Sequence, residues 1–133
     1  MATVAAVERA GLVPVLADIE SDFYTMAPTE LGKALAGDLT GVPLLKHALD
    51  SGARTVEALA RGLRDDRDRS IPDLIVLGAG PAGVNAALTA RRLGLRCEVL
   101  EAARPFATLH EFPVGKPILT YPTAFIPSGP LAV

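Results

Sequence analysis

The hydrophobic pattern divides the chain into three blocks. Residues 2–36 are weakly patterned, and their Val and Leu residues are compatible with short strands whose length Pro14 and Pro28 limit. A short buried strand is expected at Lys33–Ala36, ending at GDLTG. From residue 42 to 63, in VPLLKHALDSGARTVEALARGL, apolar residues recur at spacings of three and four. This spacing predicts an amphipathic helix, and Ser51-Gly52 predicts an interruption or bend within it.

A charged segment separates this helix from the rest of the chain. RDDRDRS, Arg64 to Ser70, alternates charge and has no apolar residue to anchor it. Such a segment is typical of a solvated connection. We therefore expect residues 1–63 and 71–133 to be two units, joined by a linker at 64–70.

The clearest βαβ unit follows the linker. The pattern predicts a strand at Leu74–Leu77, a helix from Pro81 to about Leu93 and a strand at Cys97–Leu100. The tail from Arg104 onward is rich in proline, which favours extended loops over further regular elements. The fold class that follows is α/β, with a Rossmann-like βαβ unit in a small parallel sheet.

The loop GAGPAG between the first strand and the helix has the residues that a phosphate site needs. Gly78 permits the tight turn, Gly80 allows a pyrophosphate to approach the backbone, and Gly83 allows the helix to pack near the strand. Pro81 suits the first helical position, and the N–H groups of the helix start, from Ala82 onward, attract phosphate. The alternative is a turn whose glycines serve packing alone.

An acidic residue stands where a ribose would be recognised. Glu101 ends the second strand, at the spacing typical of a carboxylate that accepts hydrogen bonds from an adenosine ribose. A carboxylate there favours FAD or NAD over NADP, because it would repel a 2′-phosphate. Arg104 is near enough to complicate this reading, but a surface role suits it better.

The residues GAGPAGVNAALTARRLGLRCEVLE resemble the FAD-binding start of the pyridine nucleotide-disulfide oxidoreductase superfamily, the thioredoxin reductase-like flavoproteins. The resemblance implies that Gly78, Gly80 and Gly83 bind the FAD pyrophosphate and that Glu101 holds the adenosine ribose. Cys97 stands where the family usually has Val, and we interpret it as a small core residue.

Two further stretches resemble the same family. LAGDLTGVPLLKHALDSGARTVEAL is similar to its late Gly-Asp motif, which implies that Asp38 contacts the flavin ribityl or phosphate region; the alternative for Asp38 is a helix cap. FPVGKPILTYPTAFIPSGPLAV, Phe112 to Val133, is similar to the segment after the first βαβ unit. Within it, Lys116 suits a solvated loop, and Tyr121 suits packing better than stacking on a ligand ring.

The order of these motifs is unusual, because the late motif precedes the early one. Either the chain crosses the junction of two tandem flavoprotein modules, or it is a permuted miniature that brings Asp38 and the glycine loop to one site. In the second arrangement the three predicted strands form a parallel sheet with right-handed crossovers. The ligand then lies at the carboxyl ends of the strands. In either arrangement the sheet is incomplete relative to a full FAD-binding domain.

Composition excludes several other classes of function. The chain has 133 residues, a formal net charge of -2 and one cysteine, so it has no basic face for nucleic acid and no CxxC pair for thiol redox chemistry. No apolar run approaches the roughly 20 residues of a membrane span, and the N-terminus lacks a basic start, so we expect a cytoplasmic protein. His47 and His110 are isolated from cysteine and from each other, which gives a metal site no support.

These observations favour an FAD-binding segment of an NAD(P)H-dependent oxidoreductase, in which hydride passes from NAD(P)H through FAD to an unknown acceptor. We expect another chain or domain to complete the fold. One alternative is a truncated, non-catalytic fragment that binds nucleotide or docks on a partner. Another is an NAD-binding module without flavin.

Overall fold

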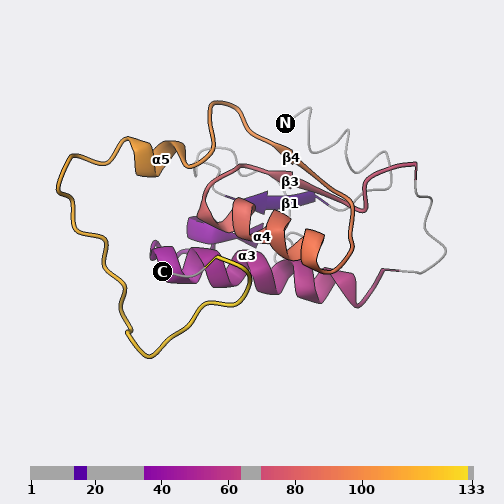
Figure 1. Cartoon of the computed structure of the whole chain (residues 1–133), viewed down its shortest axis with the longest axis horizontal. Coiled ribbons are helices and arrows are strands. Elements are labelled where there is room, and N and C mark those ends of the chain that lie inside the picture. The colour runs from indigo at the N-terminus through magenta and orange to yellow at the C-terminus, as the bar shows by residue number, and fades with distance from the viewer. Residues whose placement is uncertain (1–13, 18–34, 64–69, 132–133) are drawn as a thin grey trace.

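The computed structural model describes residues 14–17, 35–63 and 70–131, and its centre is one parallel sheet (Figure 1). Within these residues the sheet has four strands in the order β2-β1-β3-β4. The strands are β1 (Pro14–Ala17), β2 (Leu35–Ala36), β3 (Leu74–Leu77) and β4 (Cys97–Leu100). Leu16 pairs with Leu77 and Leu77 with Leu100, so the strands end nearly level with one another. Their carboxyl ends therefore form one edge of the sheet.

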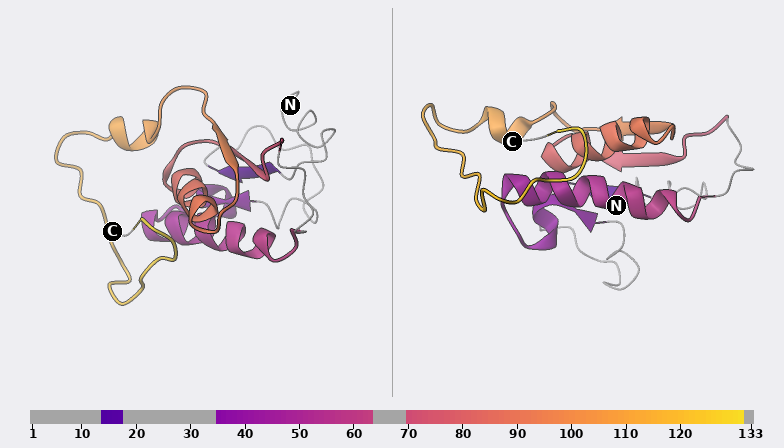
Figure 2. Two further views of the ribbon diagram at one scale, coloured as in Figure 1. Left: turned by 45° about the vertical axis from the view of Figure 1, so that its right-hand side comes forward. Right: turned by 60° about the horizontal axis from the view of Figure 1, so that its bottom comes forward.

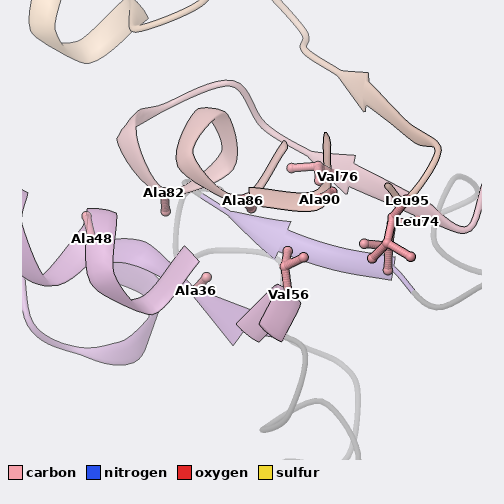
Figure 3. Close-up of a cluster of buried hydrophobic side chains, with 9 residues drawn as sticks. All are labelled: Ala36, Ala48, Val56, Leu74, Val76, Ala82, Ala86, Ala90 and Leu95. Atoms are coloured by element: carbon pink, nitrogen blue, oxygen red, sulfur yellow. The ribbon is translucent and has the colours of Figure 1, made fainter. Parts of the chain in front are cut away.

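Two helices pack side by side against the sheet. They are α3 (Leu45–Ala60) and α4 (Pro81–Arg92), each of which connects two parallel strands. Figure 3 shows the core cluster that joins them to the strands: Ala36, Ala48, Val56, Leu74, Val76, Ala82, Ala86, Ala90 and Leu95. Alanine dominates on α4, and small side chains let helices lie close to each other and to a sheet. The predicted fold class is confirmed: a small α/β fold with a Rossmann-like βαβ unit.

Helix α3 is continuous, so the interruption predicted near Ser51-Gly52 was wrong. Ser51 Oγ donates a hydrogen bond to the Ala48 carbonyl oxygen, 3.0 Å away, and accepts one from the Gly37 N–H at 2.8 Å. Gly52 is buried against α4, where an added Cβ would lie 2.1 Å from the Ala82 carbonyl oxygen. Both residues therefore serve packing, and the helix retains its backbone hydrogen bonds through them.

The amino-terminal part differs from expectation in one respect. Pro14 begins β1, a position that tolerates the missing N–H of proline. Strand β1 lies between β2 and β3, so β2 and β3 are not neighbours as a three-strand arrangement would require. Strands from both sides of the charged segment therefore share one sheet. Residues 33–34 of the predicted strand, Pro28 and residues 64–69 of the predicted linker lie outside the described residues.

The βαβ unit has the predicted bounds to within one residue, and the tail that follows it is mostly loop. Strands β3 and β4 match their predictions, and α4 ends at Arg92. One turn of helix, α5 (Ala107–His110), interrupts the tail, where no regular element was expected. Phe106, with a positive φ of 56°, precedes α5, and the Phe106 carbonyl oxygen accepts a hydrogen bond from the His110 N–H at 3.0 Å.

Beyond α5 the chain makes a wide excursion and returns. Residues 111–121, which we call the strap, extend away from the sheet beyond the start of α3 in both views of Figure 2. Residues 122–131, which we call the docked tail, return to α3 and α4. No helix in the described part of the chain is both long and apolar enough to cross a bilayer.

Candidate functional site

The glycine loop connects β3 to α4 through a tight turn. Gly78 has a φ of 100°, a conformation that favours glycine, and its N–H donates to the Leu100 carbonyl oxygen at 2.8 Å. A Cβ added to Gly83 would lie 1.9 Å from the Gly78 carbonyl oxygen. The helix can therefore approach the turn this closely only with glycine at position 83, which is the packing role expected from the sequence.

The amino end of α4 presents backbone N–H groups without a side-chain cap. Gly80 is the N-cap, Pro81 is the first helical residue, and the Gly80 carbonyl oxygen accepts the hydrogen bond of the Val84 N–H at 2.9 Å. The first N–H groups of a helix have no partner within it. At this end they include those of Ala82 and Gly83, and the helix dipole adds a partial positive charge there. Such an end stabilises a phosphate group.

Glu101 follows β4 and reaches across to the glycine loop. One carboxylate oxygen, Oε2, accepts a hydrogen bond from the Ala79 N–H at 2.6 Å, and the other, Oε1, accepts one from the Ala103 N–H at 2.9 Å. These backbone N–H groups, that of Ala79 first, lower the pKa of the Glu101 carboxyl below its usual value. The group is exposed and ionised, and each oxygen keeps a second lone pair for a ligand hydroxyl.

Asp38 lies at the same edge of the sheet, two strands away from the glycine loop. It follows β2 within η2 (Gly37–Thr40), a 3-10 turn that contacts α4. Although the residue is exposed overall, the surrounding protein desolvates its carboxyl and raises its pKa. Its side chain caps no helix end in η2, where the Gly41 N–H instead donates to the Asp38 backbone carbonyl at 2.9 Å. The structure therefore places the residues of both motifs along one edge.

Three other residues noted in the sequence are Cys97, which begins β4 at the end of that strand away from Glu101, and Arg104 and His110 in the tail. Cys97 is half-buried rather than fully buried, and burial, with the nearby Glu98, raises the pKa of its thiol to about 11. This keeps the thiol protonated, as suits a packing residue. Arg104 and His110 are exposed. The described residues contain no group of side chains suited to a metal ion.

The structure tests two residues singled out in the strap, Lys116 and Tyr121. Lys116 is exposed in a loop, as expected, and its Nζ lies 3.6 Å from the centre of the Phe112 ring, a cation–π contact. Tyr121 is 70% exposed, so its expected role in packing was wrong. His47 stacks on the ring of Phe125 with centroids 5.0 Å apart.

Sequence reasoning missed three polar residues that bind the docked tail: Lys46, Asp50 and Asn85. Lys46 and Asn85 are buried. All three side chains form hydrogen bonds with backbone groups of residues 122–131, which are far away in the sequence. The only signal in the sequence was the presence of Lys46 and Asn85 among apolar helical positions.

Comparisons with known proteins agree with this geometry. A family model described as FAD binding domain matches residues 73–110, from the start of β3 to the end of α5. A ferredoxin–NADP reductase from Ignicoccus hospitalis is 44% identical over 50 residues, which are 38% of this chain and 16% of the reductase. The chain thus matches a small part of that relative's length. No solved structure gives a significant match. The βαβ unit of this chain is therefore similar in sequence to an FAD binding domain and to part of one ferredoxin–NADP reductase.

Proposed function

We propose that the chain binds FAD along the carboxyl edge of its sheet, as the FAD-binding part of an NAD(P)H-dependent oxidoreductase. This proposal rests on one observation: the glycine loop, the uncapped amino end of α4 and the Glu101 carboxylate lie together. The Glu101 carboxylate is bonded to the Ala79 N–H within the loop itself, so the acid and the phosphate-binding end are fixed relative to each other. Such prior ordering lowers the conformational entropy that the site loses when a ligand binds.

Gly80 supports the presence of a ligand more directly than the other glycines do. Its φ of -74° and ψ of -173° are extended backbone values that any residue adopts. Conformation therefore does not require glycine at this position. We infer that glycine stands here because a bound phosphate approaches the backbone closely.

Substitution of this residue tests the assignment. We expect Gly80→Val to abolish FAD binding, because its side chain would occupy the space through which the pyrophosphate approaches. Gly62→Val is the control, since Gly62 follows α3 and a Cβ there meets only one atom, 3.6 Å away. Fluorescence titration with FAD measures both. Equal affinity of the two variants would contradict the site.

Asp38 extends the proposed site toward the flavin half of the cofactor. We expect its carboxylate to bind the ribityl or phosphate region of FAD, the role that the family resemblance implies. Asp38→Ala should weaken FAD binding about tenfold, as the loss of a charged hydrogen bond does, while AMP, which lacks the ribityl chain, binds unchanged. Isothermal titration with each nucleotide distinguishes these results. Unchanged FAD affinity would assign the upstream motif to a different site.

The proposed electron path begins at NAD(P)H and passes through FAD to an acceptor that the site does not define. The name of the matched relative, ferredoxin–NADP reductase, is consistent with a nicotinamide nucleotide as the partner in electron transfer. When bound, the flavin ring supplies the redox chemistry, and the residues of this chain bind and orient it. We propose that another domain or chain provides the nicotinamide site.

The competing proposal is a nucleotide-binding module without turnover. An NAD-binding module would retain NAD more tightly than FAD, and a partner-docking fragment would bind neither. The visible spectrum of the purified protein after addition of FAD and removal of the excess separates an FAD-binding protein from both of these cases. A retained flavin band supports the first proposal, and its absence supports one of the other two.

A further inference from the structure

The docked tail is bound to α3 through side chains that contact its backbone. Lys46, only 5% exposed, donates from Nζ to the carbonyl oxygens of Phe125 at 2.9 Å and Pro122 at 3.3 Å. These two carbonyls belong to one turn, because the Phe125 N–H donates to the Pro122 oxygen at 3.0 Å. One turn of α3 further on, Asp50 Oδ1 accepts a hydrogen bond from the Ser128 N–H at 2.9 Å.

Asn85 of α4 binds the tail and α3 together. Its Nδ2 donates to the Ser128 carbonyl oxygen and to the Leu49 carbonyl oxygen, both at 2.8 Å. Its Oδ1 accepts a hydrogen bond from the Leu131 N–H at 3.0 Å. Both amide protons and the amide oxygen are thus used, which is the full satisfaction that a buried amide needs. A single side chain links α3, α4 and the tail.

The fit at this point is close. Gly129 has a φ of +91°, and a Cβ there would lie 2.6 Å from the Asn85 amide atoms and 2.8 Å from Cβ of Ala53. The tail therefore lies directly against the facing sides of the two helices. A loosely associated segment would not require glycine for its contact.

The other end of the excursion is bound to the glycine loop. The Phe106 N–H donates to the Ala79 carbonyl oxygen at 2.9 Å, just before α5. Between these two anchors the strap exposes its apolar side chains, among them Val114, Ile118 and Leu119. The strap does not bury a core of its own, so its anchors determine its position. One anchor is the Ala79 carbonyl oxygen within the glycine loop, and the other includes Asn85, one helical turn beyond Pro81.

We propose that Lys46, Asp50 and Asn85 are positioning residues whose docking of the tail is coupled to the retention of FAD. This inference rests on the proposed function. The first turn of α4 supplies the phosphate-binding N–H groups, and its orientation depends on its packing against α3. The docked tail links both helices through Asn85, the residue that follows that turn, so its release gives the helix end and the strap more freedom. Because coupling is reciprocal, bound FAD also stabilises the docked tail.

Asp50 offers the cleanest test, because the chain provides two matched controls. Asp50→Ala removes the acceptor for Ser128, whereas Asp50→Asn retains an oxygen in the same place. Arg54→Ala removes the ion pair of Asp50 with Arg54, 2.7 Å long and 66% exposed on the arginine side, and leaves the acceptor in place. Amide hydrogen exchange at Ser128 and Leu131 measures docking, and the FAD dissociation rate measures retention.

We expect Asp50→Ala to raise both the exchange at Ser128 and the rate of FAD release about tenfold, the effect of one lost hydrogen bond. Asp50→Asn and Arg54→Ala should remain close to the wild type. Faster exchange with unchanged FAD release overturns the coupling, and so does faster release without faster exchange.

The wild-type chain provides a second measurement that needs no variant. Saturation with FAD should slow exchange at Ser128 and Leu131 about tenfold, because coupling acts equally in both directions. Unchanged exchange in the presence of bound FAD overturns the coupling while leaving the proposed function intact. Failure of the wild type to bind FAD overturns both.

Discussion

The Glu101 carboxylate is bonded to two backbone N–H groups of its own site, and this has a consequence for stability against pH. The folded-state pKa is lowered, so the stabilisation is present above the unfolded value of about 4.3 and is lost as the pH falls through the folded value. We expect Glu101→Gln to be less stable than the wild type at neutral pH, by a small amount because the group is exposed. The difference should shrink below about pH 4. Urea unfolding at several pH values measures it, and a difference independent of pH would assign the effect to packing.

Gly78 and Gly83 of the glycine loop could be predicted because each has a local cause. Gly78 is required by its backbone conformation and Gly83 by the nearness of the Gly78 carbonyl, and both are encoded within six residues. Asn85 could not be predicted in the same way. Its partners are backbone groups of Leu49, Ser128 and Leu131, and any residue type supplies those groups. Nothing in the sequence therefore marks them.

At the level of helices, the contact between α3 and α4 depends on Gly52. We expect Gly52→Ala to lower the free energy of unfolding by about 1–3 kcal/mol, because its Cβ would have to push against the Ala82 carbonyl. This loss opposes the gain of up to about 1 kcal/mol that alanine brings to a helix interior. Gly62→Ala, beyond the end of α3, is the control and should be nearly neutral. Chemical denaturation of both variants measures the difference, and a stabilised Gly52→Ala would show that the helices separate easily.

The same glycine explains why one element was predicted wrongly. Ser51-Gly52 lowers helix propensity, and propensity alone suggests a break in α3. Tertiary packing decides otherwise, since the small residues let α3 lie against α4. Strand β1 shows a related limit: its pairing with β2 and β3 depends on contacts across the sheet, which the four residues Pro14–Ala17 do not reveal. By contrast β3, α4 and β4 carry their own hydrophobic and capping signals, and their predicted bounds are confirmed to within one residue.

For the whole molecule, the arrangement of parallel strands explains how two motifs in reversed order reach one edge. Every described strand runs in the same direction, so whatever follows a strand emerges at the same side. Gly37-Asp38 follows β2, the glycine loop follows β3, and Glu101 follows β4. The order of the two motifs along the chain therefore does not prevent both from lying at the same edge of the sheet. This is the geometry that the permuted arrangement requires, with β1 added between the motifs.

The reductive half of the proposed activity provides the last prediction. The sequence has one glycine fingerprint, and the proposed FAD occupies it, so no second fingerprint remains for a nicotinamide nucleotide. We expect the FAD-loaded chain, without oxygen, to keep its visible flavin band when NADH or NADPH is added, as free FAD does over the same time. Dithionite, which needs no binding site, should bleach the band and serves as the positive control. Rapid bleaching by NADH or NADPH would show instead that this chain contains its own hydride-donor site, and the partner domain would then be unnecessary for reduction of the flavin.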